Sequence, residues 1–233
     1  MVLVERFEKN GKEIIFIGVS HSTDLFQIDL IRSKLEKMRP DVILIEGGYE
    51  NAEFLSEDDA ISRGWEMGFV SYFAKKKKIL LLPNDPSEKE CIKFIENIYG
   101  KDLAFLYFFL RNLDSLLRKD LPLSSEEKMK IVLKEFEENS QWENYDYTSS
   151  NFKRIFLETF DKDFILDNIY GNYFNSSLNY NITNEATRKI NTFRDKFMAE
   201  QIIKYLKSHN RIFIIKGKTH LFDNKELFQK LFT

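Results

Sequence analysis

The chain has 233 residues, of which 43% are hydrophobic and 31% are charged, and its formal net charge is −2. This balance is typical of a folded globular domain and differs from the polar, highly charged composition of disordered chains. The length is sufficient for one substantial core. Because the chain lacks the basic excess that neutralises many phosphates, we expect no nucleic-acid partner.

A single cysteine, Cys91, cannot form an internal disulfide or a cysteine-rich metal cluster, so we expect it to be a small core residue. Residues 1–7 are charged and lack the apolar segment of a secretion signal. The most apolar run, 103–110, is too short to span a bilayer. We therefore expect a soluble, cytoplasmic protein with no membrane partner. Whether the protein forms a homo-oligomer stays open.

The first part of the chain alternates between predicted strands and helices. Two β-rich runs, 2–7 and 13–18, are joined by Asn10-Gly11, the dipeptide most typical of a tight hairpin. Three further apolar runs are typical of strands buried on both faces, and they lie at 42–45, 79–82 and 211–215. Helical spacing of apolar residues predicts helices at 25–38, 58–76 and 184–208. This alternation indicates an α/β fold with a mostly parallel sheet.

The pattern changes between residues 87 and 183, where polar segments rich in Phe, Tyr, Asn and Glu predominate. We predict a single α/β domain over 1–233 with a helical insertion at 87–183 that caps the site. The helical candidates within it lie at 88–99, 103–118, 125–138 and 151–160. The aromatic run 105–109 is expected to pack in a core, with the lining of an apolar substrate site as the alternative.

The run 13–18 becomes continuously apolar, so it too is typical of a buried strand. Polar residues follow each of these four predicted buried strands, and this convergence is the main functional signal. These segments are 18–21, 46–48, 84–85 and 217–220. If the strands are parallel, all four segments lie along one edge of the sheet, where open α/β sheets bind their ligands. The first and last segments are both Gly-x-x-His turns, and a short helix is expected after the last, through residue 232.

The residue types in these segments fit metal or acid–base chemistry. His21 and His220 are candidate metal ligands or general bases, and Glu46 is a candidate carboxylate ligand. Gly18, Gly47 and Gly217 allow sharp turns and a close approach of the backbone to a ligand. A metal held in this way would polarise a carbonyl group and activate water for hydrolysis.

Each of these features also has a purely structural explanation. Either Gly-x-x-His turn alone can be simple strand-to-helix geometry, and Glu66 can be a surface acid on an apolar helix. Arg194-Asp195 can be a surface ion pair. The spacing required for a P-loop, a serine-hydrolase elbow, a His-Glu-x-x-His site or a Cys-x-x-Cys pair is missing.

The assembled residues resemble the TraB/PrgY/Tiki superfamily, which also includes erythromycin-esterase-like and ChaN-like proteins. Residues 18–21 and 217–220 resemble its two Gly-x-x-His motifs, and Glu46 and Glu66 resemble its two glutamates. Residues 194–199, Arg-Asp-Lys-Phe-Met-Ala, are similar to its Arg-Asp-x-x-Met-Ala stretch.

The resemblance covers residues 16–85 and 191–221 and departs from the family at one point. TraB-like members usually carry an Asp-Arg pair after the third core strand, whereas this chain has Asp85 and no arginine there. We therefore expect substrate or anion binding at this position to differ. Members of the group include metal-dependent peptidases, a histidine-based macrolide esterase, proteins that restrain peptide pheromones and a haem binder.

We predict a divalent-metal-dependent hydrolase, either a metalloprotease or an esterase, acting on a peptide or a small ester. The expected metal is Mn, Co or Zn, and its expected ligands are His21, Glu46, Glu66 and His220.

The resemblance implies that Glu66 is a fourth ligand or general base and that Arg194 stabilises anionic charge. Glu46, Glu66 and Arg194 are the candidate catalytic residues, and the other candidate site residues are Gly18, Gly47, Asp85, Asp195 and Gly217. The alternative is a non-catalytic protein that uses the same cleft to sequester a peptide, a haem or a protein partner.

Overall fold

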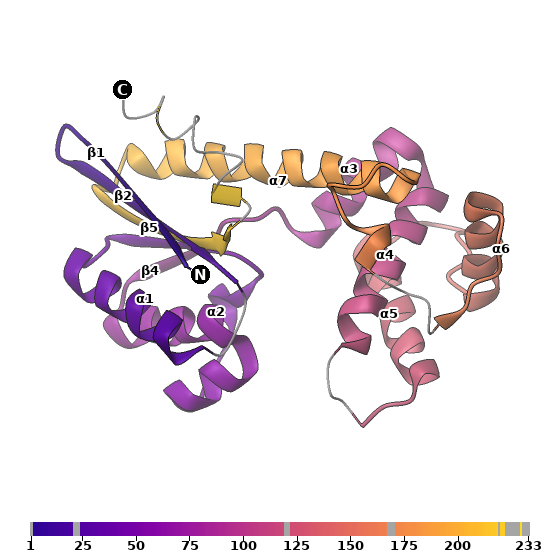
Figure 1. Cartoon of the computed structure of the whole chain (residues 1–233), viewed down its shortest axis with the longest axis horizontal. Coiled ribbons are helices and arrows are strands. Elements are labelled where there is room, and N and C mark those ends of the chain that lie inside the picture. The colour runs from indigo at the N-terminus through magenta and orange to yellow at the C-terminus, as the bar shows by residue number, and fades with distance from the viewer. Residues whose placement is uncertain are drawn as a thin grey trace. The chain divides into compact units, whose positions relative to one another are not determined.

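The computed structural model of the chain describes residues 2–20, 24–118, 122–166, 171–218, 220–221 and 229. The chain divides into two units, Met1–Pro86 with Arg194–Thr233, and Ser87–Phe193 (Figure 1). We call the first the α/β unit and the second the helical unit. Helix α7, Ile182–Leu206, contributes its first part to the helical unit and its last part to the α/β unit.

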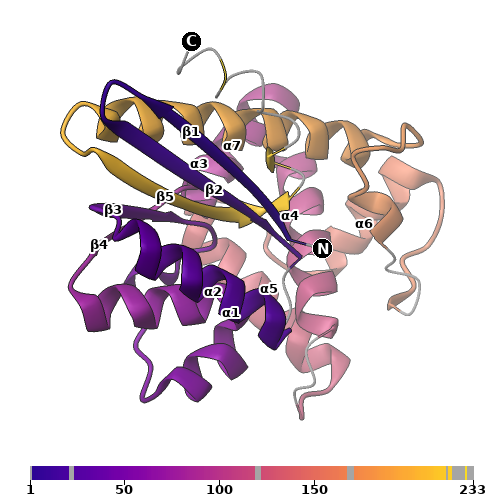
Figure 2. The ribbon, with the colours of Figure 1, turned by 60° about the vertical axis from the view of Figure 1, so that its left-hand side comes forward.

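A mixed sheet of five strands forms the centre of the α/β unit. Its strands are β1 (Leu3–Lys9), β2 (Lys12–Val19), β3 (Val42–Ile45), β4 (Leu80–Pro83) and β5 (Arg211–Gly217). The spatial order is β1-β2-β5-β3-β4 (Figure 2). Strand β1 pairs antiparallel with β2, and every other pair is parallel. The predicted α/β fold with an N-terminal hairpin is therefore confirmed.

The hairpin forms where the sequence predicts it. Asn10 and Gly11 both adopt left-handed backbone conformations, with φ of 53° and 76°. A two-residue turn of this kind matches the twist of antiparallel strands, and glycine and asparagine tolerate it best. The turn sets the register of β1 on β2, in which Lys9 lies opposite Lys12.

Helices cover both faces of the sheet, which explains why the central strands are apolar throughout (Figures 1 and 2). Alternate side chains of a strand point to opposite faces. Ile15, Ile17 and Ile43 pack in one cluster with residues of α1 (Leu25–Met38) and α2 (Glu57–Lys77). The neighbouring positions, such as Phe16 and Leu44, pack in a second cluster with Met198 and Ile202 of α7.

Strand β4 differs from the prediction, because it is not buried on both faces. Leu80 is 45% exposed, and the remaining residues of the strand are partly or fully accessible. The reason is its position at the end of the sheet, where β3 is its one pairing partner among the described strands. A run of leucines predicted the strand correctly but could not indicate that it forms an edge.

The helical unit contains the helices expected from the middle of the sequence. They are α3 (Glu88–Tyr99), α4 (Lys101–Leu117), α5 (Ser125–Ser140) and α6 (Ser149–Phe160). Ser87 and Ser124 begin α3 and α5 with capping boxes, each closed by a glutamate three residues later. Three expectations stay predictions: that residues 1–233 form a single domain, that the insertion spans 87–183, and that the insertion caps the site.

Aromatic side chains form the core of the helical unit. All five residues of the run 105–109 are at most 2% exposed, which confirms the packing expected for them. The Phe105 ring lies 5.2 Å from that of Phe136 and 6.2 Å from that of Phe152. Cys91 is buried in the same cluster, as expected for a small core residue. Among the described residues, no helix has the length and apolarity needed to cross a membrane.

The strands that carry the two Gly-x-x-His motifs are direct neighbours. Gly18 lies opposite Lys216 and Val19 lies opposite Gly217 in the parallel pairing of β2 with β5. The approach at this end of the sheet is close, because a Cβ atom on Gly18 would lie 2.9 Å from the Cα of Lys218. Gly18 is thus required by packing, independently of any role in chemistry.

Replacing Gly18 with alanine is expected to lower the free energy of unfolding by about 1–3 kcal/mol, because the added methyl group would displace the backbone at Lys218. Urea denaturation measures the change. The control is Lys9→Ala at the exposed end of β1, for which we expect a change within about 0.5 kcal/mol. Equal effects of the two substitutions would contradict the close approach.

Candidate functional site

The candidate site lies at the carboxyl edge of the parallel strands in the α/β unit. Glu46 follows β3, Asp85 follows β4 shortly after its end, and Gly217 ends β5. His21 lies outside the described residues, as do Thr219 and most of the terminal helix expected through residue 232. The described residues at this edge are joined by a network of buried charges.

Arg194 of α7 is the centre of this network. Its Nε and Nη2 atoms donate hydrogen bonds to the two carboxylate oxygens of Asp85, at 3.0 and 2.8 Å. Nη2 also donates to Oε1 of Glu46 at 2.5 Å. The guanidinium group therefore binds one carboxylate through two atoms and a second carboxylate through one. These contacts tie α7 to the segments that follow β3 and β4.

Lys216 is a second cation in the network, and the sequence analysis did not select it. Its Nζ atom donates to Oδ1 of Asp85 at 2.7 Å and to the carbonyl oxygen of Asn84 at 3.5 Å. The side chain is completely buried. A lysine at the end of the apolar run 212–215 was the signal that could have identified it, since buried lysines are rare unless they are paired.

Glu46 links the ends of two neighbouring strands. Its Oε2 atom accepts a hydrogen bond from the backbone N–H of Gly217 at 2.6 Å, while Oε1 accepts from Arg194. Gly47 and Gly48 follow with φ of 86° and 75°, left-handed values that favour glycine. The chain can therefore turn away directly after Glu46, which leaves the carboxylate at the strand end.

Strand alternation explains why these side chains meet. Glu46 continues the face of β3 that contains Leu44, and Lys216 continues the face of β5 that contains Ile214. Both of these apolar residues pack in the cluster that contains residues of α7. The same face thus changes from apolar to charged at its carboxyl end, where Arg194 is available as a partner.

The network balances its own charge, with two carboxylates and two cations. Burial raises the pKa of Glu46, but the charges of Arg194 and Lys216 and the Gly217 hydrogen bond outweigh it, leaving the pKa below 4.5. Burial also raises the pKa of Asp85, and Arg194 and Lys216 bring it well below 3.8. Burial lowers the pKa of Arg194, whereas Asp85 and Glu46 raise it above its ordinary value. All three groups therefore remain ionised at neutral pH.

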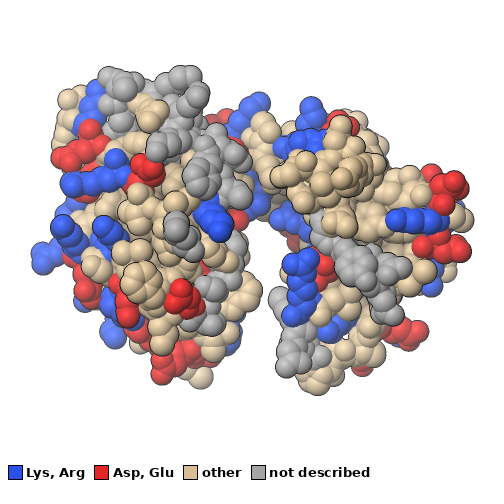
Figure 3. Space-filling model, in the orientation of Figure 1, with Lys and Arg blue, Asp and Glu red and all other residues tan. Residues whose placement is uncertain are grey.

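On the described surface of the α/β unit shown in Figure 3, lysines and arginines are interspersed with aspartates and glutamates. This mixed surface agrees with the net charge of −2. The charges of the candidate site differ from these exposed ones because their side chains are at most 14% exposed. Solvent therefore screens the site charges less than it screens the surface charges.

His220 and Asp195 form a second polar pair at the same edge. Nδ1 of His220 lies 2.7 Å from Oδ1 of Asp195, and His220 is 6% exposed. In the neutral imidazole this contact assigns the proton to Nδ1, so Nε2 is the nitrogen that can bind a metal or accept a proton. Asp195 follows Arg194 on α7, so consecutive residues in the middle of one helix make both sets of polar contacts.

Glu66 occupies a different position from the other predicted residues. It is completely buried in α2, whose neighbouring residues Met67 and Phe69 pack on the face of the sheet opposite α7. Trp65, directly before it, interrupts the helix with φ 51° and ψ −137°. Burial raises the pKa of Tyr49, and the nearby charge of Glu66 raises it further. The charge of Glu66 therefore acts on the Tyr49 hydroxyl group.

The described residues fit a divalent metal poorly. They contain no group of three or more His, Cys, Asp or Glu side chains placed to hold one. Glu46 and Asp85 bind the cations of Arg194 and Lys216, which would compete with a metal for the same oxygens. His21, an expected ligand, is outside the described residues. Binding of Mn, Co or Zn stays a prediction.

The structure therefore brings together Glu46, Asp85, Arg194 and Gly217 in one network, with Asp195 and His220 paired beside it. The Arg194 guanidinium is already balanced by two carboxylates, which favours a positioning role over binding of a substrate anion. Its predicted role in stabilising anionic charge stays a prediction. No protein-family model, curated protein or solved structure matches the chain.

Replacing Arg194 with methionine is expected to lower the free energy of unfolding by about 3–5 kcal/mol, because it leaves Glu46 and Asp85 as buried like charges. Chemical denaturation provides the measurement. Arg63→Met is the matched control, since Arg63 pairs with Asp59 at a side-chain exposure of 59%. We expect that control to change stability by less than about 1 kcal/mol. Equal losses for both variants would show that the network contributes no more than a surface ion pair.

The contribution of Asp85 to stability should depend on pH. Because its pKa is lowered in the folded state, its ionised form stabilises the fold above the ordinary value of 3.8. That contribution is lost as the pH falls below this value. The difference in unfolding free energy between the wild type and Asp85→Asn should therefore be largest near about pH 7 and shrink below about pH 4.

The control for this titration is Asp29→Asn, at a carboxylate whose side chain is 76% exposed. Its effect on the free energy of unfolding should be small throughout the pH range. A difference between the wild type and Asp85→Asn that stays constant from neutral to acidic pH would contradict the charged network.

Proposed function

We propose that the chain is a hydrolase of peptide or ester bonds in which His220 is the general base. The observation that carries the proposal is the buried contact between His220 Nδ1 and Asp195 Oδ1 at 2.7 Å. A carboxylate in this position fixes the tautomer of the imidazole and stabilises it after it gains a proton. The ring is thereby prepared to exchange protons through Nε2.

The proposed reaction needs only water and the substrate. Nε2 of His220 takes a proton from water as the water oxygen forms a bond to the carbonyl carbon of the substrate. The tetrahedral species then breaks its carbon–oxygen or carbon–nitrogen bond, and the imidazolium returns the proton to the departing alcohol or amine. The Nδ1 proton stays on the imidazole ring and is hydrogen-bonded to Asp195. The negative charge of Asp195 balances the positive charge of the imidazolium.

The position of the pair supports this proposal. Parallel α/β sheets bind their ligands at the carboxyl edge, and His220 follows β5 at that edge. The order of the Gly-x-x-His motifs and the sequence 194–199 support membership of the TraB/PrgY/Tiki group, which we propose on the same basis. The adjacency of β2 and β5 is compatible with both motifs contributing to one site.

The charge network has a positioning role in this proposal. Glu46 holds the backbone of Gly217, three residues before His220, and Arg194 holds Glu46 from the helix that carries Asp195. The network therefore connects both members of the His220–Asp195 pair to the sheet edge. A rigid pair requires less reorganisation when it transfers a proton.

A panel of peptides and esters tests the proposal on the purified full chain. We expect His220→Ala to lower kcat/KM by at least about 100-fold and Asp195→Asn by at least about tenfold. His209→Ala is the matched control, because His209 precedes β5 and bonds to Ser208 and Tyr205 instead. It should leave kcat/KM unchanged. Circular dichroism verifies that each variant is folded.

Three outcomes would overturn this mechanism. Hydrolysis that survives His220→Ala at the wild-type rate excludes His220 as the base. Activity that is abolished by a chelator and restored by Mn, Co or Zn supports the metal-dependent prediction in place of metal-free general-base catalysis. If folded protein binds members of the panel and hydrolyses none, the non-catalytic alternative replaces the hydrolase.

A further inference from the structure

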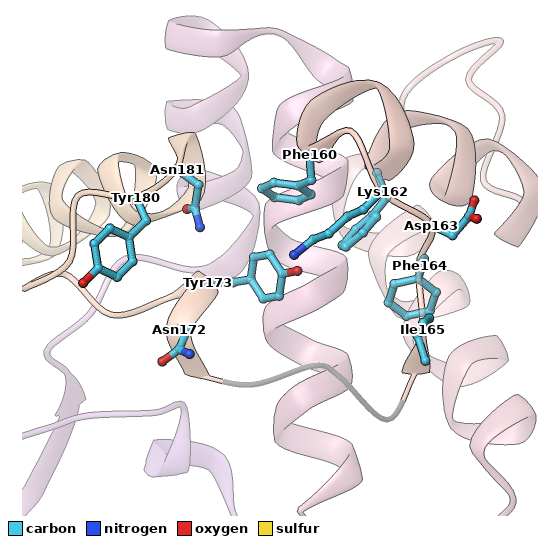
Figure 4. Close-up of a pocket in the computed structure, with 10 residues that line it drawn as sticks. Phe160, Lys162, Asp163, Phe164, Ile165, Asn172, Tyr173, Tyr180 and Asn181 are labelled. Carbon is cyan, nitrogen blue, oxygen red and sulfur yellow. The ribbon is translucent and has the colours of Figure 1, made fainter.

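The helical unit contains a cavity of about 770 Å³ that is lined by none of the candidate site residues (Figure 4). Its volume lies within the range of small-molecule sites, roughly 300–1,000 Å³. The lining comes from the end of α6, the segment that follows it, the turn at Gly171–Tyr173 and the segment before α7. These segments are distant in sequence from the Gly-x-x-His motifs.

Aromatic rings form the apolar wall of the cavity. Phe156 and Tyr173 are 3% and 8% exposed, and their ring centroids lie 5.9 Å apart. The Phe160 ring lies 4.8 Å from Phe156 and 5.0 Å from Tyr173, inclined by about 60° to each. Phe164 completes this wall at 5.2 Å from Phe156. Neighbouring rings of this wall are thus inclined to one another.

A cation lies directly beside this wall. Helix α6 ends at Phe160, and Asp161, the residue that caps it, has a left-handed conformation with φ 52° and ψ 40°. Nζ of Lys162 then lies 5.2 Å from the ring centroid of Tyr173 and 6.0 Å from that of Phe160. Figure 4 shows the ammonium group directed toward these rings, while the carboxylate of Asp163 points away. Lys162 forms no ion pair with another described residue.

Amide groups line the opposite side of the cavity. Figure 4 shows Asn172 and Asn181 across from Lys162, beside Tyr180. Oδ1 of Asn181 accepts hydrogen bonds from Thr183 and from the backbone of Asn184, so Nδ2 is its donor group toward a ligand. The Asn184 side chain also donates to the carbonyl oxygen of Asn172. These bonds fix the polar wall to the start of α7.

We propose that this cavity binds a small aromatic carboxylate. Its ring would pack against Phe160 and Tyr173, because aromatic pairs favour offset and edge-to-face contacts. Its carboxylate would pair with Lys162, the cation at the edge of the wall. The combination of aromatic surface with Lys162, the one cation among the described lining residues, favours this class over neutral aromatics. This binding site is independent of the proposed hydrolase site.

Calorimetric titration of the full chain with 2-naphthoate tests the proposal. We expect saturable binding that Lys162→Gln weakens roughly tenfold, because a hydrogen bond to a charged group is lost. The matched control is Lys134→Gln on α5, whose side chain is 76% exposed and outside the cavity. It should leave the affinity unchanged. The neutral analogue 2-naphthylmethanol should bind more weakly and respond to neither substitution.

Each contrary result would overturn a stated part of the proposal. If 2-naphthoate does not bind, the proposed binding site is wrong. If 2-naphthylmethanol binds with equal affinity, the cation has no role in binding. Tighter binding of octanoate than of 2-naphthoate would replace the aromatic class with an aliphatic one. An equal loss of affinity in Lys134→Gln would assign the attraction to general surface charge, which increasing salt should then abolish.

Discussion

The contact of Arg194 with two carboxylates is the interaction on which the arrangement of the α/β unit's carboxyl edge depends. It joins Asp85 after β4 and Glu46 after β3 to α7, and Glu46 extends the connection to the backbone of Gly217. These groups are nearly inaccessible to solvent, so removal of one charge leaves its partner unbalanced. Ionic pairing therefore determines the local geometry here, whereas apolar packing determines it in the rest of the sheet.

This constraint connects the fold to the proposed chemistry. The helix that supplies Arg194 also supplies Asp195, and the strand end that Glu46 holds leads to His220. Three of the predicted site residues thus have identifiable positioning contacts: Glu46, Asp85 and Arg194. We propose that these residues support the His220–Asp195 pair, while their roles as ligands or anion binders stay predictions. Lys216 completes that support by neutralising the remaining charge of Asp85.

Local patterns in the sequence were sufficient to predict the hairpin, the parallel strands and the helices of both units. They could not predict partners that are remote in sequence, such as Arg194 and Asp85, which are 109 residues apart. The exposure of β4 also depends on strand order, which a leucine run does not encode. The break at Trp65 and the aromatic cavity near Lys162 arise from packing between segments without a regular period.

The tautomer of His220 tests the central claim most directly, because general-base catalysis through Nε2 requires the proton to be on Nδ1. Nitrogen NMR of the histidine side chains, at a pH where the ring is neutral, distinguishes the two forms. We predict a protonated Nδ1 in the wild type, held by Asp195, and a mixture of tautomers in Asp195→Ala. A wild-type ring protonated on Nε2 would contradict the account.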